Sequence, residues 1–358
     1  MGKIRVALIG IGNCASSLVQ GCHFYRDANE GEEIPGVIRP LLGGYRIQDV
    51  EFCVAIDIDK NKVGKDLGEA IFVPPNNTLK FCSVGEAGVT VAMGNPLDGL
   101  GTYLSQKIEI APEAPVDVAK VLRDNRVEVV VNFLPVGSDR ATQWYASQVL
   151  EAGCGFVNCI PAFIAKEKEW REKFEKAVLP LIGDDIKSQL GATILHRNLT
   201  RLFSERGVKL ERTSQLNVGG NMDFYNMLER SRLESKKISK TDAVVSQLNH
   251  SLDASDVHIG PSDYVPWLED RKWAYIRMEG RSFGNAPIHL ELKLEVWDSP
   301  NAAGIVIDAL RCCKIGLDRG LRGALLGPSA YFMKSPPFQY SDSRALSMLE
   351  DFIRSNQP

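Results

Sequence analysis

Several features that define other classes of protein are missing from this sequence of 358 residues. It contains no run of about 18 consecutive apolar residues, so no membrane-spanning helix is expected. Its 42 lysines and arginines do not outnumber its 45 aspartates and glutamates, which argues against a general nucleic-acid binder. Lys3 and Arg5 lead into an alternating run rather than into the apolar segment of a secretory signal. We therefore expect a cytoplasmic protein with neither a membrane nor a nucleic-acid partner.

Metal-ligand spacing is also missing. The eight cysteines form no CxxC pair, and the five histidines form no HxxxH pair. In a reducing compartment, such cysteines are expected to be small buried apolar residues, and each histidine is expected to be structural or exposed. The sequence therefore identifies no metal-binding residue.

From residue 3 to about residue 158, strand-like runs alternate with helical stretches. The clearest predicted strands cover residues 4–9, 50–58, 127–133 and 155–158, and predicted helices cover residues 141–152 and 166–176. This alternation predicts an α/β fold with a Rossmann-like, doubly wound parallel sheet. Two segments rich in Gly and Pro interrupt it, at residues 27–48 and 74–105. We expect the first to loop out and the second to be a mobile excursion.

Beyond residue 191 the pattern changes. Helices are predicted at residues 196–206, 240–248 and 302–319, and strands at residues 208–217, 273–280 and 288–296. In the last strand, charged residues alternate with apolar ones, which is typical of a sheet with one wet or ligand-facing side. We predict an α+β second domain at residues 191–304, inserted into a first domain made of residues 1–190 and 305–358.

Residues 10–15 (GIGNCA) follow the first predicted strand and open a helix, in the GxGxxA form of a dinucleotide-binding loop. Gly10 permits the tight turn, Gly12 lets the backbone approach a pyrophosphate, and Ala15 lets the helix pack closely on the strand. The helix N-terminus attracts phosphate groups. The motif alone could be a coincidental turn, but its position in an alternating chain favours a dinucleotide site.

Asp57 closes the second predicted strand and is a candidate for binding the cofactor ribose, which would favour NAD over NADP. It lies about 45 residues after the loop rather than about 20, and the segment 27–48 would account for the difference. Asp57 could instead cap a turn. The cofactor-binding candidates of this region are Gly10, Gly12, Asn13, Cys14, Ala15 and Asp57.

Six blocks along the chain resemble the myo-inositol-1-phosphate synthases. They are residues 10–17 (GIGNCASS), 183–189 (GDDIKSQ), 217–223 (NVGGNMD), 234–240 (ESKKISK), 295–300 (EVWDSP) and 331–337 (YFMKSPP). The resemblance follows the family order from residue 4 to about residue 352, and it is greatest to the short bacterial and archaeal branch. It implies an isomerase that converts glucose 6-phosphate to inositol 3-phosphate.

According to this resemblance, bound NAD takes a hydride from C5 of the sugar phosphate. An enolate formed at C6 then attacks the C1 aldehyde, and the hydride returns, so that no net oxidation occurs. The resemblance further implies a homotetramer assembled through the sheet of the second domain and a supply of inositol for phospholipid synthesis. Some family members are helped by a divalent or monovalent cation, whose ligands here are unknown.

Four lysines become catalytic candidates through the resemblance, namely Lys236, Lys240, Lys293 and Lys334. An enolate and a phosphate both require nearby cations. Residues 239–242 (SKTD) have the form of a helix start, which would place Lys240 in a first turn and Lys236 just before it, at an anion site. The first two could instead lie in a solvated basic turn, Lys293 could be a surface residue paired with a glutamate, and Lys334 could be an ordinary surface lysine.

Asp185 and Asp298 complete the catalytic candidates, because an acid beside a lysine stabilises its charged form. Asp185 could instead cap a helix, and Asp298 could initiate a turn. By position in the family, further cofactor contacts are Asp66, Tyr145, Ser188, Asp223 and Lys236. Asp66 could equally lie on a solvated helix face.

Two other functions compete with the synthase. One is an NAD-dependent dehydrogenase or reductase of another small phosphorylated substrate, which would consume NAD. The other is a non-catalytic NAD-binding protein, in which the lysines would be dispensable.

Overall fold

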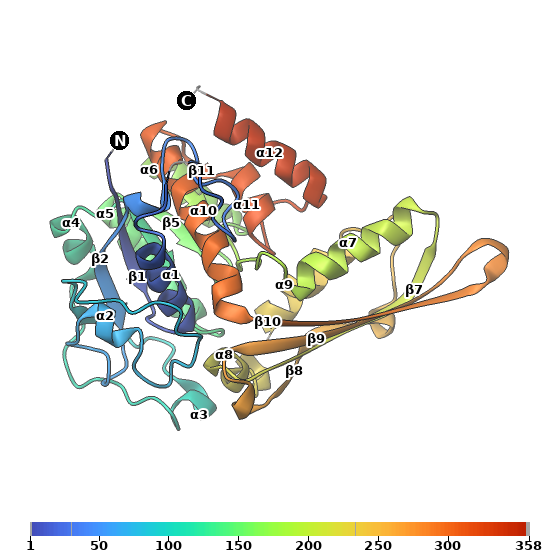
Figure 1. Cartoon of the computed structure of the whole chain (residues 1–358), viewed down its shortest axis with the longest axis horizontal. Coiled ribbons are helices and arrows are strands. Elements are labelled where there is room, and N and C mark those ends of the chain that lie inside the picture. The colour runs from blue at the N-terminus through green and yellow to red at the C-terminus, as the bar shows by residue number, and fades with distance from the viewer. Residues whose placement is uncertain (1, 30, 233, 356–358) are drawn as a thin grey trace.

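Two β-sheets organise the chain in the computed structural model, which describes residues 2–29, 31–232 and 234–355 (Figure 1). For residues 234–237 and 261–262, only the backbone is described. The strands of the first sheet are β1 (Ile4–Ile9), β2 (Val50–Asp57), β3 (Val91–Met93), β4 (Val129–Asn132), β5 (Gly155–Asn158), β6 (Pro180–Ile182) and β11 (Gly323–Ala324). These seven strands are parallel and follow the order β11-β6-β5-β4-β1-β2-β3. The predicted doubly wound sheet is confirmed, and its strand order reverses between β1 and β4.

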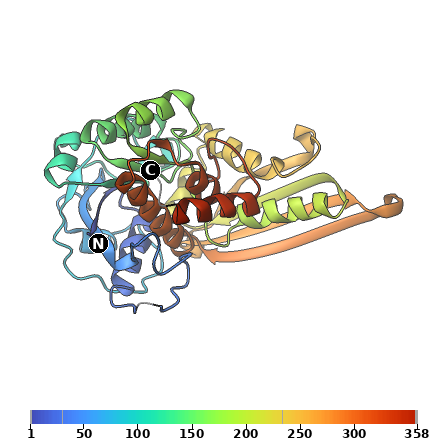
Figure 2. The ribbon, with the colours of Figure 1, turned by 90° about the horizontal axis from the view of Figure 1, so that it is seen from above.

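Helices cover both faces of this sheet (Figure 2). The helices of this part of the chain are α1 (Asn13–Phe24), α2 (Leu67–Ala70), α3 (Gly101–Leu104), α4 (Val118–Asp124), α5 (Asp139–Ala152), α6 (Lys168–Ala177), α10 (Asp298–Asp318), α11 (Leu326–Phe332) and α12 (Asp342–Arg354). Helices α1 and α10 pack on one face, and α4, α5 and α6 pack on the other. Because successive strand residues point to opposite faces, Val6 and Leu8 enter one core while Ala7 and Ile9 enter the other.

The second sheet extends away from the first and has the order β10-β9-β7-β8 (Figure 1). Its elements are α7 (Ala192–Glu205), β7 (Lys209–Gly219), α8 (Met222–Asn226), α9 (Glu234–Val245), β8 (Val257–Tyr264), β9 (Arg271–Arg281) and β10 (Pro287–Trp297). Helices α7 and α9 pack together on one face of the sheet, where Leu210, Ile276 and Met278 are buried. The opposite face carries no helix within the described ranges and exposes Leu216 and Tyr275.

The predicted alternation in β10 is confirmed. Leu290 and Leu292 pack toward the core of the second sheet, whereas Glu291 and Lys293 are exposed. The predicted helix at residues 240–248 was placed wrongly, since α9 begins at Glu234. Helix propensity in this stretch continues upstream of residue 240, so the helix-start pattern at residues 239–242 does not mark the boundary.

We propose that the two sheets correspond to two domains with the predicted boundaries, residues 1–190 with 305–358, and residues 191–304. Strand β11 supports this division, because it returns the C-terminal part of the chain to the first sheet beside β6. Helix α10 starts next to the second sheet and then packs against α1 of the first, so it joins the two.

A buried ion pair on α10 holds the segment 27–48 in place. Asp308 and Arg311 pair with each other and are inaccessible to solvent. Asp308 accepts a hydrogen bond from the backbone N–H of Ile38, and Arg311 donates to the carbonyl oxygens of Arg39 and Pro40. The segment loops out as predicted, but this buried pair fixes it to the core.

The segment 74–105 is more regular than predicted. It contains β3, the edge strand that pairs with β2 through residues such as Val91 and Met93, and the short helix α3. A strand of three residues is too short to produce a recognisable hydrophobic period.

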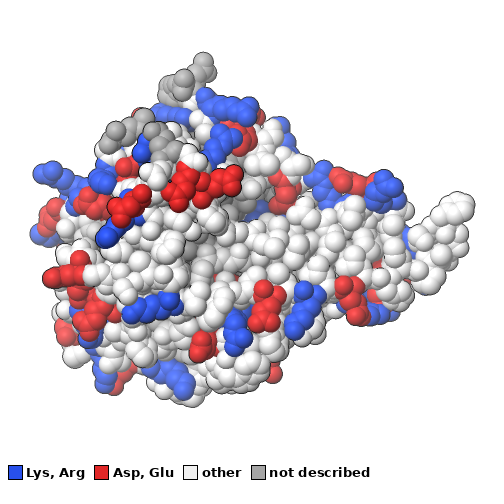
Figure 3. Space-filling view, in the orientation of Figure 1, with Lys and Arg blue, Asp and Glu red and all other residues white. Residues whose placement is uncertain are grey.

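Charges of both signs are interspersed over the face of the molecule seen in Figure 3, with no large patch of one sign among the residues drawn there. None of the described helices combines the length and the apolarity needed to cross a bilayer. The cysteines are free, and five of them are buried, as predicted. In the described part of the chain, no cluster of His, Cys, Asp and Glu is suited to hold a metal ion.

Replacing Arg311 with Met should lower the free energy of unfolding by about 3–5 kcal/mol, because it leaves the Asp308 carboxylate buried without its partner. Urea unfolding followed by circular dichroism measures this loss. Lys120→Met, which breaks the exposed Lys120–Asp124 pair on α4, is the control and should unfold like the wild type. Equal stability of Arg311→Met and wild type would show that the ion pair does not anchor the segment.

Candidate active site

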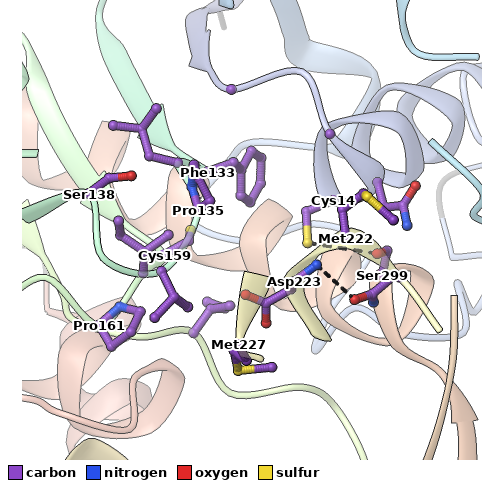
Figure 4. Close-up of a pocket in the computed structure, with 18 of the residues that line it drawn as sticks. Cys14, Phe133, Pro135, Ser138, Cys159, Pro161, Met222, Asp223, Met227 and Ser299 are labelled. Carbon is purple, nitrogen blue, oxygen red and sulfur yellow. Dashed lines mark hydrogen bonds between the residues drawn. The ribbon is translucent and has the colours of Figure 1, made fainter. Parts of the chain in front are cut away.

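A cavity of about 300 Å³ lies where the first sheet meets the second. It is lined on one side by the glycine-rich loop between β1 and α1, and on the other by β7, α8, α9 and the N-terminal turn of α7. Figure 4 shows part of this lining, with Cys14 and Ser299 on one side, Phe133, Pro135 and Ser138 on the other, and Asp223 between them. The cavity sits at the strand-order reversal, where open α/β sheets bind their ligands.

The glycine-rich loop has the geometry that the sequence predicts. Gly10 has φ +88°, and a Cβ atom there would lie 2.8 Å from the carbonyl oxygen of Phe133. Apart from the adjoining residues of the loop, no atom of the described residues lies within 4 Å of a Cβ built on Gly12, so the space above that residue is open. Ala15 is fully buried and lets α1 pack on the sheet. The loop therefore leaves room for an anion at the N-terminus of α1.

Asp57 stabilises this loop directly. Its carboxylate accepts hydrogen bonds from the backbone N–H groups of Ile11, Ile58 and Asp59, at 2.6, 2.7 and 2.9 Å. It thus caps a turn, as the alternative interpretation expects, and it also lines the cavity. Its contact with a ribose stays a prediction.

Five of the other predicted cofactor contacts line the cavity, namely Asn13, Cys14, Tyr145, Ser188 and Asp223. The Asn13 side chain accepts from the backbone N–H of Asn77 at 2.8 Å. Burial raises the pKa of the Cys14 thiol to about 12, so it stays protonated. Tyr145 accepts from the backbone N–H of Asn95 at 3.1 Å, and burial raises its pKa to about 12 as well.

Asp66 lies elsewhere. It caps α2 by accepting a hydrogen bond from the backbone N–H of Gly68, and it also accepts from the backbone N–H groups of Ala87 and Val89. It does not line the cavity. These bonds lower its pKa against the opposing effect of burial. Asp66 is therefore a local structural residue rather than the cofactor contact expected from the family.

Three lysines and three acids line the same cavity, namely Lys240, Lys272, Lys334, Asp185, Asp223 and Asp298. Lys334 Nζ lies 2.9 Å from Asp185 Oδ1, and the other carboxylate oxygen of Asp185 accepts a hydrogen bond from the Ser239 hydroxyl at 2.7 Å. Lys272 pairs with Asp298. Lys240 and Asp223 line the same cavity. The structure thus brings together four predicted residues that are far apart in sequence, Lys240, Lys334, Asp185 and Asp298.

The anion site expected at the start of α9 is not where the sequence placed it. Lys240 lies in the middle of α9, and the Ser239 hydroxyl donates to Asp185 instead of capping a helix. The N-terminus of α7 lines the cavity instead, through Gly191, Ala192 and Thr193. The backbone of Lys236 lies in the first turn of α9, and its side chain lies outside the described residues.

The structure corrects the prediction that Lys293 lies at the catalytic site, and it adds Lys272, which was not predicted. Lys293 lies on the uncovered face of the second sheet, with its ammonium group over the rings of Trp273 and Tyr275, and it does not line the cavity. Of these two lysines, Lys272 is the one that lines the cavity. In the sheet it is the register partner of Gly219 and of Val296, which belong to two of the matched blocks. Only strand pairing reveals this, and the sequence alone does not give the pairing.

Asp270 is a second residue of the site that was not predicted from the sequence. Its side chain is fully buried and accepts hydrogen bonds from the side-chain amides of Asn13 and Asn221, at 3.2 and 2.8 Å. It also accepts from the backbone N–H of Ser299 at 3.1 Å and from its hydroxyl at 2.9 Å. Burial, and then the nearby charge of Asp298, raise its pKa to about 6. Asp270 therefore joins the glycine-rich loop, α8 and α10.

The fold and the cavity together define a Rossmann-type enzyme whose dinucleotide loop faces a cluster of lysines and acids. A family model described as myo-inositol-1-phosphate synthase matches residues 191–299. The chain is 56% identical to an inositol-3-phosphate synthase of Mycolicibacterium smegmatis, over 98% of both chains. It is 55% identical to an inositol-3-phosphate synthase of Mycobacterium tuberculosis, over 98% of this chain and 96% of that protein.

A solved structure supports the same relationship. It is that of a myo-inositol-1-phosphate synthase-related protein of Thermotoga maritima, which is 25% identical, covers 99% of this chain and 100% of that chain, and has a TM-score of 0.80. The chain belongs to the inositol-3-phosphate synthase family and is an enzyme of that family.

Replacing Lys272 with Met should reduce inositol phosphate formation by about 10²–10³-fold, the usual cost of losing one charge-stabilising group at a reaction centre. Lys293→Met is the matched control, because it removes a lysine from the same sheet but outside the cavity, and it should keep the wild-type rate. The rates of the two purified variants decide between the two lysines. A wild-type rate in Lys272→Met, or an equal loss in both variants, would contradict this assignment.

Proposed function

We propose that the chain converts D-glucose 6-phosphate to 1D-myo-inositol 3-phosphate with NAD as a bound, regenerated cofactor. The observation that carries the proposal is that the dinucleotide loop at Gly10 and Gly12 lines one continuous cavity with Lys240, Lys272 and Lys334. A cofactor bound at the loop would therefore reach a sugar phosphate bound at the lysines.

The residues around the loop fit NAD. The open space above Gly12 and the first turn of α1, whose cap makes no side-chain hydrogen bond, suit a pyrophosphate. Asp57 and Tyr145 line the cavity beyond the loop and would contact the rest of the cofactor. When bound, NAD supplies reversible hydride transfer at C5 of the substrate, without net oxidation.

The substrate phosphate would bind at the N-terminus of α7. This helix begins after Gly191, which provides no side-chain cap, so the N–H groups of its first turn have no acceptor within the helix. Ser188, Lys240 and Lys334 line the cavity beside this turn. A phosphate dianion there would be neutralised by both the helix N-terminus and the lysines.

The remaining chemistry needs cations near the sugar carbons. With C5 at the ketone level, a proton leaves C6, negative charge develops on the C5 oxygen, and C6 then bonds to C1. We assign stabilisation of this charge to Lys272 and Lys334, whose partners Asp298 and Asp185 fix their positions. Lys236 remains a further catalytic prediction from its place in the matched block.

The product assay tests the proposal directly. Purified chain, NAD and glucose 6-phosphate should yield inositol phosphate while the total of NAD stays constant, because the hydride returns to the substrate. The amount of inositol phosphate is measured by product analysis, and the amount of NADH is measured by its absorbance. Accumulation of NADH in proportion to product would instead identify a dehydrogenase.

We also propose that the chain forms a homotetramer through the uncovered face of the second sheet. Leu216 and Tyr275 are register partners on that face and are exposed by 41% and 42%, so they form an apolar contact that a second copy of the sheet could cover. Sedimentation velocity of the purified protein should give the mass of four chains, and a stable monomer at micromolar concentration would refute the assembly. The cytoplasmic location, the role in phospholipid synthesis and the help of a divalent or monovalent cation remain predictions.

A further inference from the structure

The covered face of β7 is polar where it borders the cavity. Thr213, Gln215 and Asn217 alternate along the strand and are at most 5% exposed, and His196 of α7 packs against them with no exposure at all. Gln215 and Asn217 line the cavity, whereas His196 lies behind them. Buried polar groups of this kind add little net stability compared with apolar packing, so their presence next to a substrate cavity calls for another explanation.

The hydrogen bonds of these groups can be oriented from one end to the other. Asn217 donates its amide N–H to the carbonyl oxygen of Gly260 at 2.7 Å, so its Oδ1 faces Gln215 Nε2 at 3.2 Å. Gln215 Oε1 must then face His196 Nδ1, at 3.1 Å. Because an amide oxygen only accepts, Nδ1 carries the imidazole proton and Nε2 is an acceptor. The Thr213 hydroxyl lies 2.7 Å from Nε2 and 2.9 Å from the carbonyl oxygen of Arg277, and its single proton turns toward Nε2, the nearer of the two acceptors.

This order of donors and acceptors determines which way the side-chain amide of Gln215 is oriented. Burial lowers the pKa of His196 to about 4, so the ring stays neutral and keeps one tautomer at neutral pH. Its Nδ1–H holds the oxygen of Gln215, and the nitrogen is left on the side of Asn217. That nitrogen has two hydrogens, and in the described part of the chain Asn217 accepts only one of them.

We propose that Gln215 donates its second amide N–H to a hydroxyl oxygen of the sugar phosphate in the cavity, and that His196 is the positioning residue that prevents its amide from flipping. This inference rests on the proposed function, because the ligand is the sugar phosphate named there. It adds a determinant of hydroxyl recognition that is distinct from the lysines and from the phosphate site. His196 takes no part in proton transfer.

Monodeoxy analogues of glucose 6-phosphate test the contact. In the wild type, one of the 2-, 3- and 4-deoxy compounds should lose about tenfold in kcat/KM relative to glucose 6-phosphate, the loss expected for one neutral hydrogen bond. In Gln215→Met, glucose 6-phosphate should lose a similar factor, mainly through a higher KM, and the same analogue should lose nothing further. A tenfold penalty for that analogue that persists in Gln215→Met would overturn the contact.

Two variants at position 196 test the positioning role. The Asn side chain places an N–H close to the position of His196 Nδ1, so His196→Asn should keep most of the KM for glucose 6-phosphate, whereas His196→Phe should raise it toward that of Gln215→Met. Thr200→Val is the matched control, because Thr200 lies one turn further along α7, is fully buried, and its hydroxyl has no partner in the described structure. A wild-type KM in His196→Phe would remove His196 from the role.

The outcomes are separable from those of the proposed function. If the wild type makes no inositol phosphate, the proposed function itself fails. If the wild type is active and every deoxy analogue is penalised equally in wild type and Gln215→Met, only the present inference fails. If His196→Phe does not fold, the analogue series in Gln215→Met still decides the contact, and His196→Asn against Thr200→Val decides the positioning.

Discussion

The buried carboxylate of Asp270 is the constraint on which the active site depends. It collects hydrogen bonds from Asn13 of the glycine-rich loop, from Asn221 at the start of α8 and from Ser299 in the first turn of α10. These elements belong to different parts of the fold, and a single acceptor holds them within bonding distance of one another. The raised pKa of Asp270 reflects what its burial costs, and several donors offset that cost. Lys272 lies two residues after Asp270, so the same short stretch of chain holds these elements together and supplies a cation to the cavity.

The cavity divides its tasks between the two sheets. The first sheet offers backbone N–H groups and a glycine-rich turn, which suit a dinucleotide without adding net charge. The second sheet and its helices add Lys272 and Lys240, and the segment after α11 adds Lys334. Mutually repelling ammonium groups in one cavity need acids to hold them, and Lys272 and Lys334 each have one, in Asp298 and Asp185. The acids are therefore as much a part of the site as the lysines.

Much of the fold and part of the site could be predicted from the sequence. Strand β1 and the loop at Gly10 were predictable because alternation, a tight turn and a helix start are all local signals. Lys240 and Lys334 were predicted only through the family resemblance, which also rests on short stretches of sequence. Lys272 and Asp270 were missed because their importance comes from strand register and from contacts across the molecule, which no local pattern carries. Lys293 was predicted and Lys272 was not for the same reason, since the structure places both lysines in β-strands and only the pairing shows which one lines the cavity.

Helix α10 links two places that look unrelated. Its first residue is Asp298, the partner of Lys272, and its third and fourth turns carry the buried pair Asp308 and Arg311, which holds the segment 27–48. A helix of this length is a stiff rod of about 30 Å. The segment 27–48 is thus connected through α10 to the active site and is not an independent surface loop. Insertions or deletions in this segment would tilt α10 and so shift Asp298 at its other end. Engineering of this enzyme should therefore change the segment 27–48 and the active site together.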